Sequence, residues 1–157
     1  MLRFTAALLP ALLISMAAHA ASVPFTLTVT NAPITISGTS ASISGNASLS
    51  LAGAAAVSGT FVASGSLSNI SGTNLTVPFT LTLSNGTVTG TMTFPVTALT
   101  TAGSVSGSAT ITGGTGSYQG YTGASTSASG AVSGSILTSL TLSFTISGTV
   151  NTSSTGG

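Results

Sequence analysis

The sequence contains almost no charged residues. Its 157 residues include one arginine and one histidine, and they contain no Lys, Asp, Glu, Cys or Trp. Arg3 and His19 both lie within the first twenty positions, so the only ionisable side chains in residues 21–157 are those of two tyrosines. The usual general acids, general bases and metal ligands are therefore absent from this part of the chain. We expect no enzymatic activity, no cofactor and no metal site.

The same absences restrict the partners that the chain is expected to bind. Residues 21–157 contain no Lys or Arg that could neutralise phosphate, so we expect no binding of nucleic acid. Without cysteine there are no disulfide bonds, and packing must supply the stability. Partners must then be recognised by shape, by hydroxyl hydrogen bonds or by apolar contact. Self-association or binding of neutral glycans meets these conditions.

The first twenty residues have the pattern of a secretory signal peptide. Arg3 precedes an apolar run from Phe4 to Ala17, and Ala18-His19-Ala20 has the small-x-small form of a cleavage site. We therefore expect export, removal of residues 1–20, and a location outside the cell or at its surface. The apolar run is short for a membrane-spanning helix, and we expect no transmembrane segment after cleavage.

Beyond Ala21, apolar and hydroxyl residues alternate with a period of two. This alternation is typical of strands with one face in a core and the other in water. Because no charges protect sheet edges, we expect residues 21–150 to form one closed antiparallel β-barrel of about eight strands, with a β-sandwich as the alternative. Residues 151–157 contain no apolar side chain and are expected to form a flexible tail. The clearest runs are 25–30, 79–84, 88–94 and 140–146.

One hexapeptide occurs twice. Residues 23–28 and 77–82 both read Val-Pro-Phe-Thr-Leu-Thr. Asn31 and Asn85 occupy equivalent positions after the two copies. The pattern favours an internal duplication within the barrel domain, although a sequence of low complexity also raises the number of chance matches.

The most distinctive stretch is Thr112–Gly123, which contains five glycines, both tyrosines and the only glutamine. Gln119 stands where a dinucleotide-binding loop needs its third glycine, and no helix is predicted to follow, so we expect no phosphate site. We expect a structural corner in which glycines allow close backbone approach and Tyr118 fills the interior, with a ligand-binding corner as the alternative. The candidate residues are Gly113, Gly114, Gly116, Tyr118, Gly120, Tyr121 and Gly123.

Residues 113–123 resemble the Gly-Gly-Thr-Gly-x-[Phe/Tyr] hairpin of the dirigent and allene-oxide-cyclase barrel superfamily. Similar segments occur in bacterial secreted proteins rich in Ser, Thr and Gly. The resemblance is local, with compatible strands over 104–112 and 124–135. It implies an eight-stranded antiparallel barrel in which this segment is one hairpin. The activities of those families are not implied, because their pockets depend on acidic residues that this chain lacks.

Two functional hypotheses follow from these observations. The first is an exported, non-catalytic structural or surface-interaction protein of the cell envelope or matrix. The second is a small-molecule-binding barrel with an apolar, partly empty interior around Phe25, Phe79, Phe94 and Phe144, which predicts an internal cavity of a few hundred cubic ångströms.

Five asparagines also begin Asn-x-Ser/Thr sequons, which accept N-linked glycans in hosts that modify them. They are Asn46, Asn69, Asn74, Asn85 and Asn151.

Overall fold

The computed structural model of the chain describes residues 21–135, 137 and 139–152. The expected signal peptide and residues 153–157 of the expected tail lie outside the described residues. Three short 3-10 helices, η1 (Leu67–Asn69), η2 (Val96–Leu99) and η3 (Gly116–Tyr118), connect strands. The ten strands are β1 (Ala21–Ser37), β2 (Ser40–Leu51), β3 (Val57–Ser66), β4 (Ile70–Ser71), β5 (Asn74–Leu83), β6 (Gly86–Pro95), β7 (Gly103–Ser106), β8 (Ser108–Gly114), β9 (Thr122–Ser135) and β10 (Ser139–Thr152).

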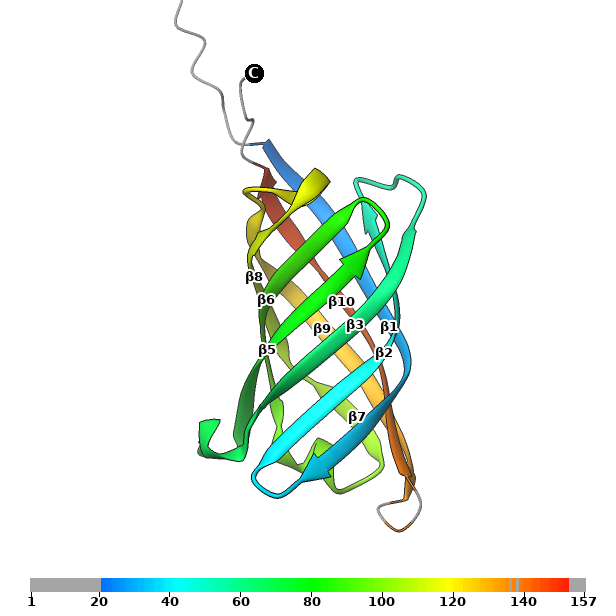
Figure 1. Cartoon of the computed structure of the whole chain (residues 1–157), viewed down its shortest axis with the longest axis vertical. Coiled ribbons are helices and arrows are strands. Elements are labelled where there is room, and N and C mark those ends of the chain that lie inside the picture. The colour runs from blue at the N-terminus through cyan, green and yellow to red at the C-terminus, as the bar shows by residue number, and fades with distance from the viewer. Residues whose placement is uncertain (1–20, 136, 138, 153–157) are drawn as a thin grey trace, which may run out of the picture.

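Eight of these strands form a closed antiparallel barrel (Figure 1). Around the wall they follow the order β1, β2, β3, β5, β6, β8, β9 and β10, and β10 pairs again with β1. The two remaining strands are short: β4 pairs with β5, and β7 pairs with β9. Closure confirms the expected barrel of about eight strands and excludes the sandwich.

The barrel has two ends that differ in their connections. β1 begins and β10 ends at the same end, which we call the upper end (Figure 1). The loop between β2 and β3, the turn between β5 and β6, and η3 also lie there. The β1–β2 turn, η1, η2 and the β9–β10 hairpin lie at the lower end. In the described part of the chain, no helix is long and apolar enough to cross a membrane.

The alternation of residue types sorts side chains between the interior and the outer wall. In β5, exposed and buried residues alternate along the whole strand, with Leu75, Val77, Phe79, Leu81 and Leu83 buried. The outward positions of the same strand carry mainly threonine. Among the described residues, no polar or charged side chain is buried. The core is therefore apolar, and the outer wall carries the hydroxyl groups.

Four core phenylalanines each lie directly opposite a glycine on the neighbouring strand. The pairs are Phe25–Gly148, Phe61–Gly45, Phe79–Gly90 and Phe144–Gly130. An eight-stranded barrel is only just wide enough for side chains to fill it, and small residues opposite large ones fit such an interior. The glycines thus leave room for the rings.

The rings pack against one another at the centre of the barrel. Phe61 is fully buried, and its ring centroid lies 5.4 Å from those of both Phe79 and Phe144. The first pair is stacked and the second meets edge to face. Such geometries are favourable for aromatic pairs beyond the burial of their area. The interior is consequently organised around Phe61.

The strand expected over 104–112 is divided into β7 and β8 at Gly107. The Gly107 N–H donates to the Ala128 carbonyl at 2.9 Å, and the Ala109 N–H donates to the Ser125 hydroxyl at 2.8 Å. On β9, the register with β10 shifts near Thr126. A bulge disrupts the backbone hydrogen bonds between strands locally. Here the Ser125 hydroxyl oxygen, in place of a backbone carbonyl, accepts from the Ala109 N–H.

The two copies of the hexapeptide adopt the same structure, but the residues that follow them do not. Phe25 in β1 and Phe79 in β5 both point into the core. Beyond the hexapeptides, Asn31 continues β1, whereas Asn85 lies in the turn between β5 and β6. The internal duplication therefore stays a prediction that rests on the hexapeptide.

The C-terminal strand is longer than expected. Asn151 and Thr152, which the sequence placed in the flexible tail, form the end of β10 and pair with Ser22 and Ala21. The predicted boundary was wrong because it was based on the lack of apolar side chains after residue 150. The backbone of Ala21 and Ser22 in β1 pairs with Thr152 and Asn151, and this pairing cannot be seen in the composition.

Replacing Gly90 by alanine should destabilise the barrel. The added Cβ would clash with the Thr110 carbonyl oxygen and lie 2.8 Å from Cε1 of Phe79. Overpacking of this kind costs about 1–3 kcal/mol, measurable by urea unfolding. Gly113→Ala is the matched control, because its Cβ would lie 3.6 Å from Oγ1 of Thr89. Equal stability of the two variants would contradict the role assigned to the Phe79–Gly90 pair.

The free energy of unfolding of residues 21–157 should not depend on pH between about pH 5 and 7. No side chain of this segment titrates there, so the folded and unfolded chains bind the same number of protons. Urea unfolding at several pH values and at NaCl concentrations up to about 0.15 M provides the measurement. A reproducible shift of the midpoint within these limits would show that the explanation is incomplete.

Candidate functional site

The corner singled out by the sequence lies at the upper end, between β8 and β9. β8 ends at Gly114, and β9 begins at Thr122. The Tyr118 N–H donates to the Thr115 carbonyl at 3.1 Å, and the Tyr121 N–H donates to the Tyr118 carbonyl at 3.2 Å. Gly116 and Gly120 have φ angles of 60° and 79°, a conformation that favours glycine. The segment is therefore a tight corner with two required left-handed positions.

The corner is attached to the neighbouring β5–β6 connection. The Thr115 N–H donates to the Thr87 carbonyl at 2.9 Å, and the Ser117 N–H donates to the Asn85 carbonyl at 3.0 Å. The Thr115 hydroxyl accepts from the Thr87 N–H at 3.2 Å and lies 2.8 Å from the Thr87 hydroxyl. These bonds fix the corner over the edge of the upper opening.

Three candidate glycines lie where a side chain would not fit. A Cβ at Gly114 would lie 2.6 Å from the Tyr118 carbonyl oxygen. One at Gly116 would clash with the Asn85 carbonyl, and one at Gly123 with that of Thr149. Gly113 has ordinary space around it. The close approaches support a structural interpretation of the corner.

The two tyrosines take different positions. Tyr118 is only 2% exposed and belongs to the hydrophobic core, whereas Tyr121 is half-buried against it. Their ring centroids are 5.6 Å apart in an edge-to-face arrangement. The Tyr118 hydroxyl has no hydrogen-bond partner among the described residues. Its ring, rather than its polar group, anchors the corner.

A pocket of about 140 Å³, which we call the mouth pocket, lies between this corner and the β2–β3 loop. Leu49, Leu51 and Val57 contribute apolar side chains to it, together with the rings of Tyr118 and Tyr121. Asn85 and Ser117 contribute polar groups. The sequence drew attention to the tyrosines, but it did not reveal that β2 and β3 would meet them, because that contact depends on closure.

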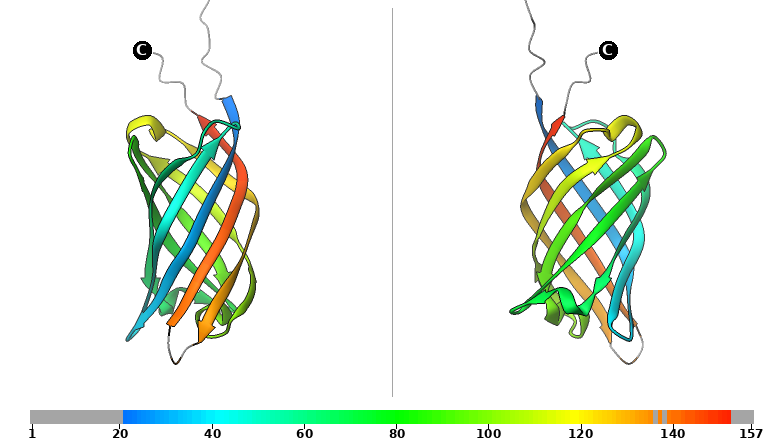
Figure 2. Two further views of the ribbon diagram at one scale, coloured as in Figure 1. Left: turned by 90° about the vertical axis from the view of Figure 1, so that its right-hand side faces the viewer. Right: turned by 60° about the vertical axis from the view of Figure 1, so that its left-hand side comes forward.

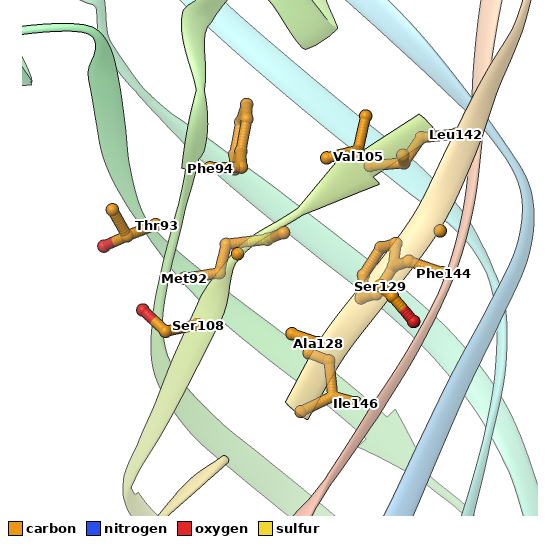
Figure 3. A pocket seen from close by; sticks show the side chains of 12 residues that line it. Met92, Thr93, Phe94, Val105, Ser108, Ala128, Ser129, Leu142, Phe144 and Ile146 are labelled. Carbon is orange, nitrogen blue, oxygen red and sulfur yellow. The ribbon is translucent and has the colours of Figure 1, made fainter. Parts of the chain in front are cut away.

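The interior beside Phe94 and Phe144 contains little free space. Figure 3 shows Met92, Phe94, Phe144 and Ile146 around a cavity that is lined by residues of β6, β7, β8, β9 and β10. Its volume is about 20 Å³, enough for one water molecule. The expected internal cavity of a few hundred cubic ångströms is not present beside Phe94 and Phe144. The mouth pocket, which Tyr118 helps to line, is larger than this cavity.

The register of the barrel aligns the outward hydroxyl groups into rows that cross the strands. Neighbouring strands lie about 4.8 Å apart, so each row is a series of closely spaced donors and acceptors. The rows were not evident in the sequence, where only the period of two is visible. One row contains Thr30, Asn46, Thr60, Thr82 and Thr87, and a second contains Thr145, Thr28, Ser48 and Ser58.

The asparagines of the five sequons are all exposed. Asn46 lies in the first of these rows, on β2, and Asn151 lies on β10. Asn74 begins β5, Asn69 ends η1, and Asn85 lies in the β5–β6 turn. Exposure makes each a sterically accessible acceptor.

Replacing Tyr118 by alanine should destabilise the protein by about 3 kcal/mol or more, because a buried ring is lost from the core. Tyr118→Phe is the control and should change stability by less than about 0.5 kcal/mol, since the hydroxyl has no hydrogen-bond partner in the described part of the chain. Thermal and urea unfolding of both variants give the comparison. Full stability of Tyr118→Ala would return the corner to consideration as a binding site.

The chain was compared with known families, with curated proteins and with solved structures. No family model matches it, and no curated protein or solved structure shows significant similarity to it. The resemblance of residues 113–123 to the dirigent and allene-oxide-cyclase hairpin therefore stays a prediction that rests on those residues alone.

Proposed function

We propose that this protein is an exported, non-catalytic structural or surface-interaction protein whose outer wall contacts neutral partners. The observation that carries the proposal is the outer wall itself. Hydroxyl groups form rows across successive strands, and residues 21–157 offer no charged side chain. The proposed location is the cell envelope or the surrounding matrix.

The energetics of such a wall favour partners with many neutral hydrogen-bonding groups. A single hydrogen bond contributes only about 0.5–1.5 kcal/mol net, so a useful affinity requires several at once. A glycan, or another copy of this hydroxyl-covered wall, presents repeated donors and acceptors. Because no ion pair is involved, the interaction should be nearly independent of salt.

The absence of acids and bases supports a non-catalytic role. Serine and threonine hydroxyls act as nucleophiles only when a neighbouring group accepts their proton. Residues 21–157 contain no His, Asp, Glu, Lys or Cys to do so. The hydroxyl rows are therefore suited to binding.

The mouth pocket supports binding of a small molecule as a second candidate function. Most of the residues that line it are apolar or aromatic, and Asn85 and Ser117 provide hydrogen-bonding groups. At about 140 Å³ it is smaller than the usual ligand site of about 300 Å³ or more. This hypothesis accordingly predicts a small, mostly apolar ligand at the corner.

Retention on producing cells, or self-association, should be independent of ionic strength. The secreted protein is expected to partition with cells or to sediment as oligomers equally at 0.02 and about 0.5 M NaCl, because screening acts only on charges. Fractionation followed by analytical ultracentrifugation measures both. Thr82→Lys with Thr89→Lys is the control, since it adds positive charges to the outer wall, and their repulsion between copies should make self-association depend on salt.

The proposal would be wrong if the protein were recovered entirely as a monomer in the medium and bound neither surfaces nor glycans at any salt concentration. Retention lost on modest addition of salt would also contradict it, because such behaviour requires charged contacts.

A further inference from the structure

The outer wall is hollowed over β1, β2 and β3. The depression has a volume of about 340 Å³, within the usual range of small-ligand sites. We call it the β1–β3 depression. β1 and β2, which form most of it, run side by side in the left view of Figure 2. Five outward side chains line it, those of Thr28, Thr30, Asn46, Ser48 and Ser58.

The depression lies beside a bulge in β1. The register of β1 shifts against β10 between Val29 and Ala32, and against β2 between Thr30 and Ile34. Asn31 has a φ angle of 49°, and its N–H donates to the Ser143 hydroxyl at 3.0 Å. Bulges bend a strand and redirect its side chains. The bulge therefore accounts for a local hollow in an otherwise convex wall.

The neighbouring strand accommodates this bulge. A Cβ at Gly45 of β2 would lie 2.7 Å from Cβ of Ala32 on β1. Gly45 is also the partner of Phe61 in the core. Gly45 therefore lies between the bulge of β1 and the central ring of the interior.

The polar groups that line the depression are available to a ligand. None of the five side chains has a hydrogen-bond partner among the described residues. Elsewhere on the outer wall, some hydroxyl groups bond to each other at 2.8 Å, namely the pairs Thr76–Thr93, Thr87–Thr115 and Ser133–Thr141. The depression therefore combines a concave shape with unused donors and acceptors.

We propose that the β1–β3 depression binds a segment of a neutral glycan chain, an inference that rests on the proposed function and assigns its site. Hydroxyls act as donors and acceptors, and the Asn46 carboxamide provides both as well. A charged ligand would find no opposite charge in residues 21–157, and an apolar ligand would leave the polar lining unsatisfied. A chain of sugar hydroxyls satisfies the lining without charge.

Asn46 also begins a sequon, so one residue of this site is an acceptor for an N-linked glycan in hosts that modify sequons. A glycan attached to Asn46 would occupy the depression from within the same molecule. Binding experiments therefore require protein from a host that does not N-glycosylate.

The test uses the full chain as secreted by such a host, with cellohexaose and maltohexaose as neutral probes and hexagalacturonate as the anionic counterpart. We expect a neutral probe to shift backbone amide resonances of β1, β2 and β3 in NMR titrations, with a Kd of about 1 mM, as suits a few neutral hydrogen bonds. We expect hexagalacturonate to bind more weakly.

Two double variants provide a matched comparison. Thr28→Val with Asn46→Ala removes polar groups from the depression, and we expect at least a tenfold loss of affinity. Thr80→Val with Asn74→Ala makes the same chemical changes on β5, at exposed positions that lie outside the depression and outside the two hydroxyl rows. We expect this control to bind within twofold of the unaltered protein. Ser58→Ala, measured alone, replaces the first double variant if that variant does not fold.

Unchanged affinity of the depression variant, shifts confined to β5 and β6 or to the mouth pocket, or preference for hexagalacturonate would overturn the inference. Absence of binding by both neutral probes would overturn it as well. If the protein is still retained on cells at all salt concentrations in these cases, the proposed function stands without this site. Absence of retention, of self-association and of binding by both neutral probes would instead refute the site and the proposed function together.

Discussion

The pairing of phenylalanine with glycine across neighbouring strands is the constraint on which the rest of this structure depends. Eight strands enclose a narrow interior, and the rings of Phe25, Phe61, Phe79 and Phe144 fill it only because glycine stands opposite each one. A larger residue would displace either the ring or the strand. This fit is compatible with a closed wall, and the register of the closed wall aligns the outward hydroxyls.

The same packing links the interior to the surface. Gly45 lies opposite Phe61 and also allows Ala32 of the β1 bulge to approach β2. The bulge lies beside the hollow in which the side chains of Asn46 and its neighbours have no hydrogen-bond partner among the described residues. Residues 21–157 contain no charged side chain, so electrostatic patches cannot distinguish one part of this surface from another. Shape and unpaired neutral groups are then the features that a partner can recognise.

The corner at Thr112–Gly123 shows how much of the local structure can be predicted from residue types alone. Its unusual composition predicted close backbone approach and a buried Tyr118, and both are present. Its attachment to the β5–β6 connection through Thr115 and Thr87 was not predictable, because those strands are distant in sequence. The mouth pocket was missed for the same reason. The outward rows and the β1–β3 depression also depend on the register between strands. A period of two does not determine this register, because moving a strand by an even number of residues keeps the same side chains inside.

The sequence by itself determined the all-β class, the inward and outward faces of the strands, and the neutrality of residues 21–157. These properties are local, since alternation and composition can be read from neighbouring residues. Only the tertiary structure decided which glycine faces which ring, which hydroxyls share a row, and where β1 bulges. Those outcomes depend on pairing between distant segments, and they are selected jointly by ring packing and by closure of the hydrogen-bonded wall.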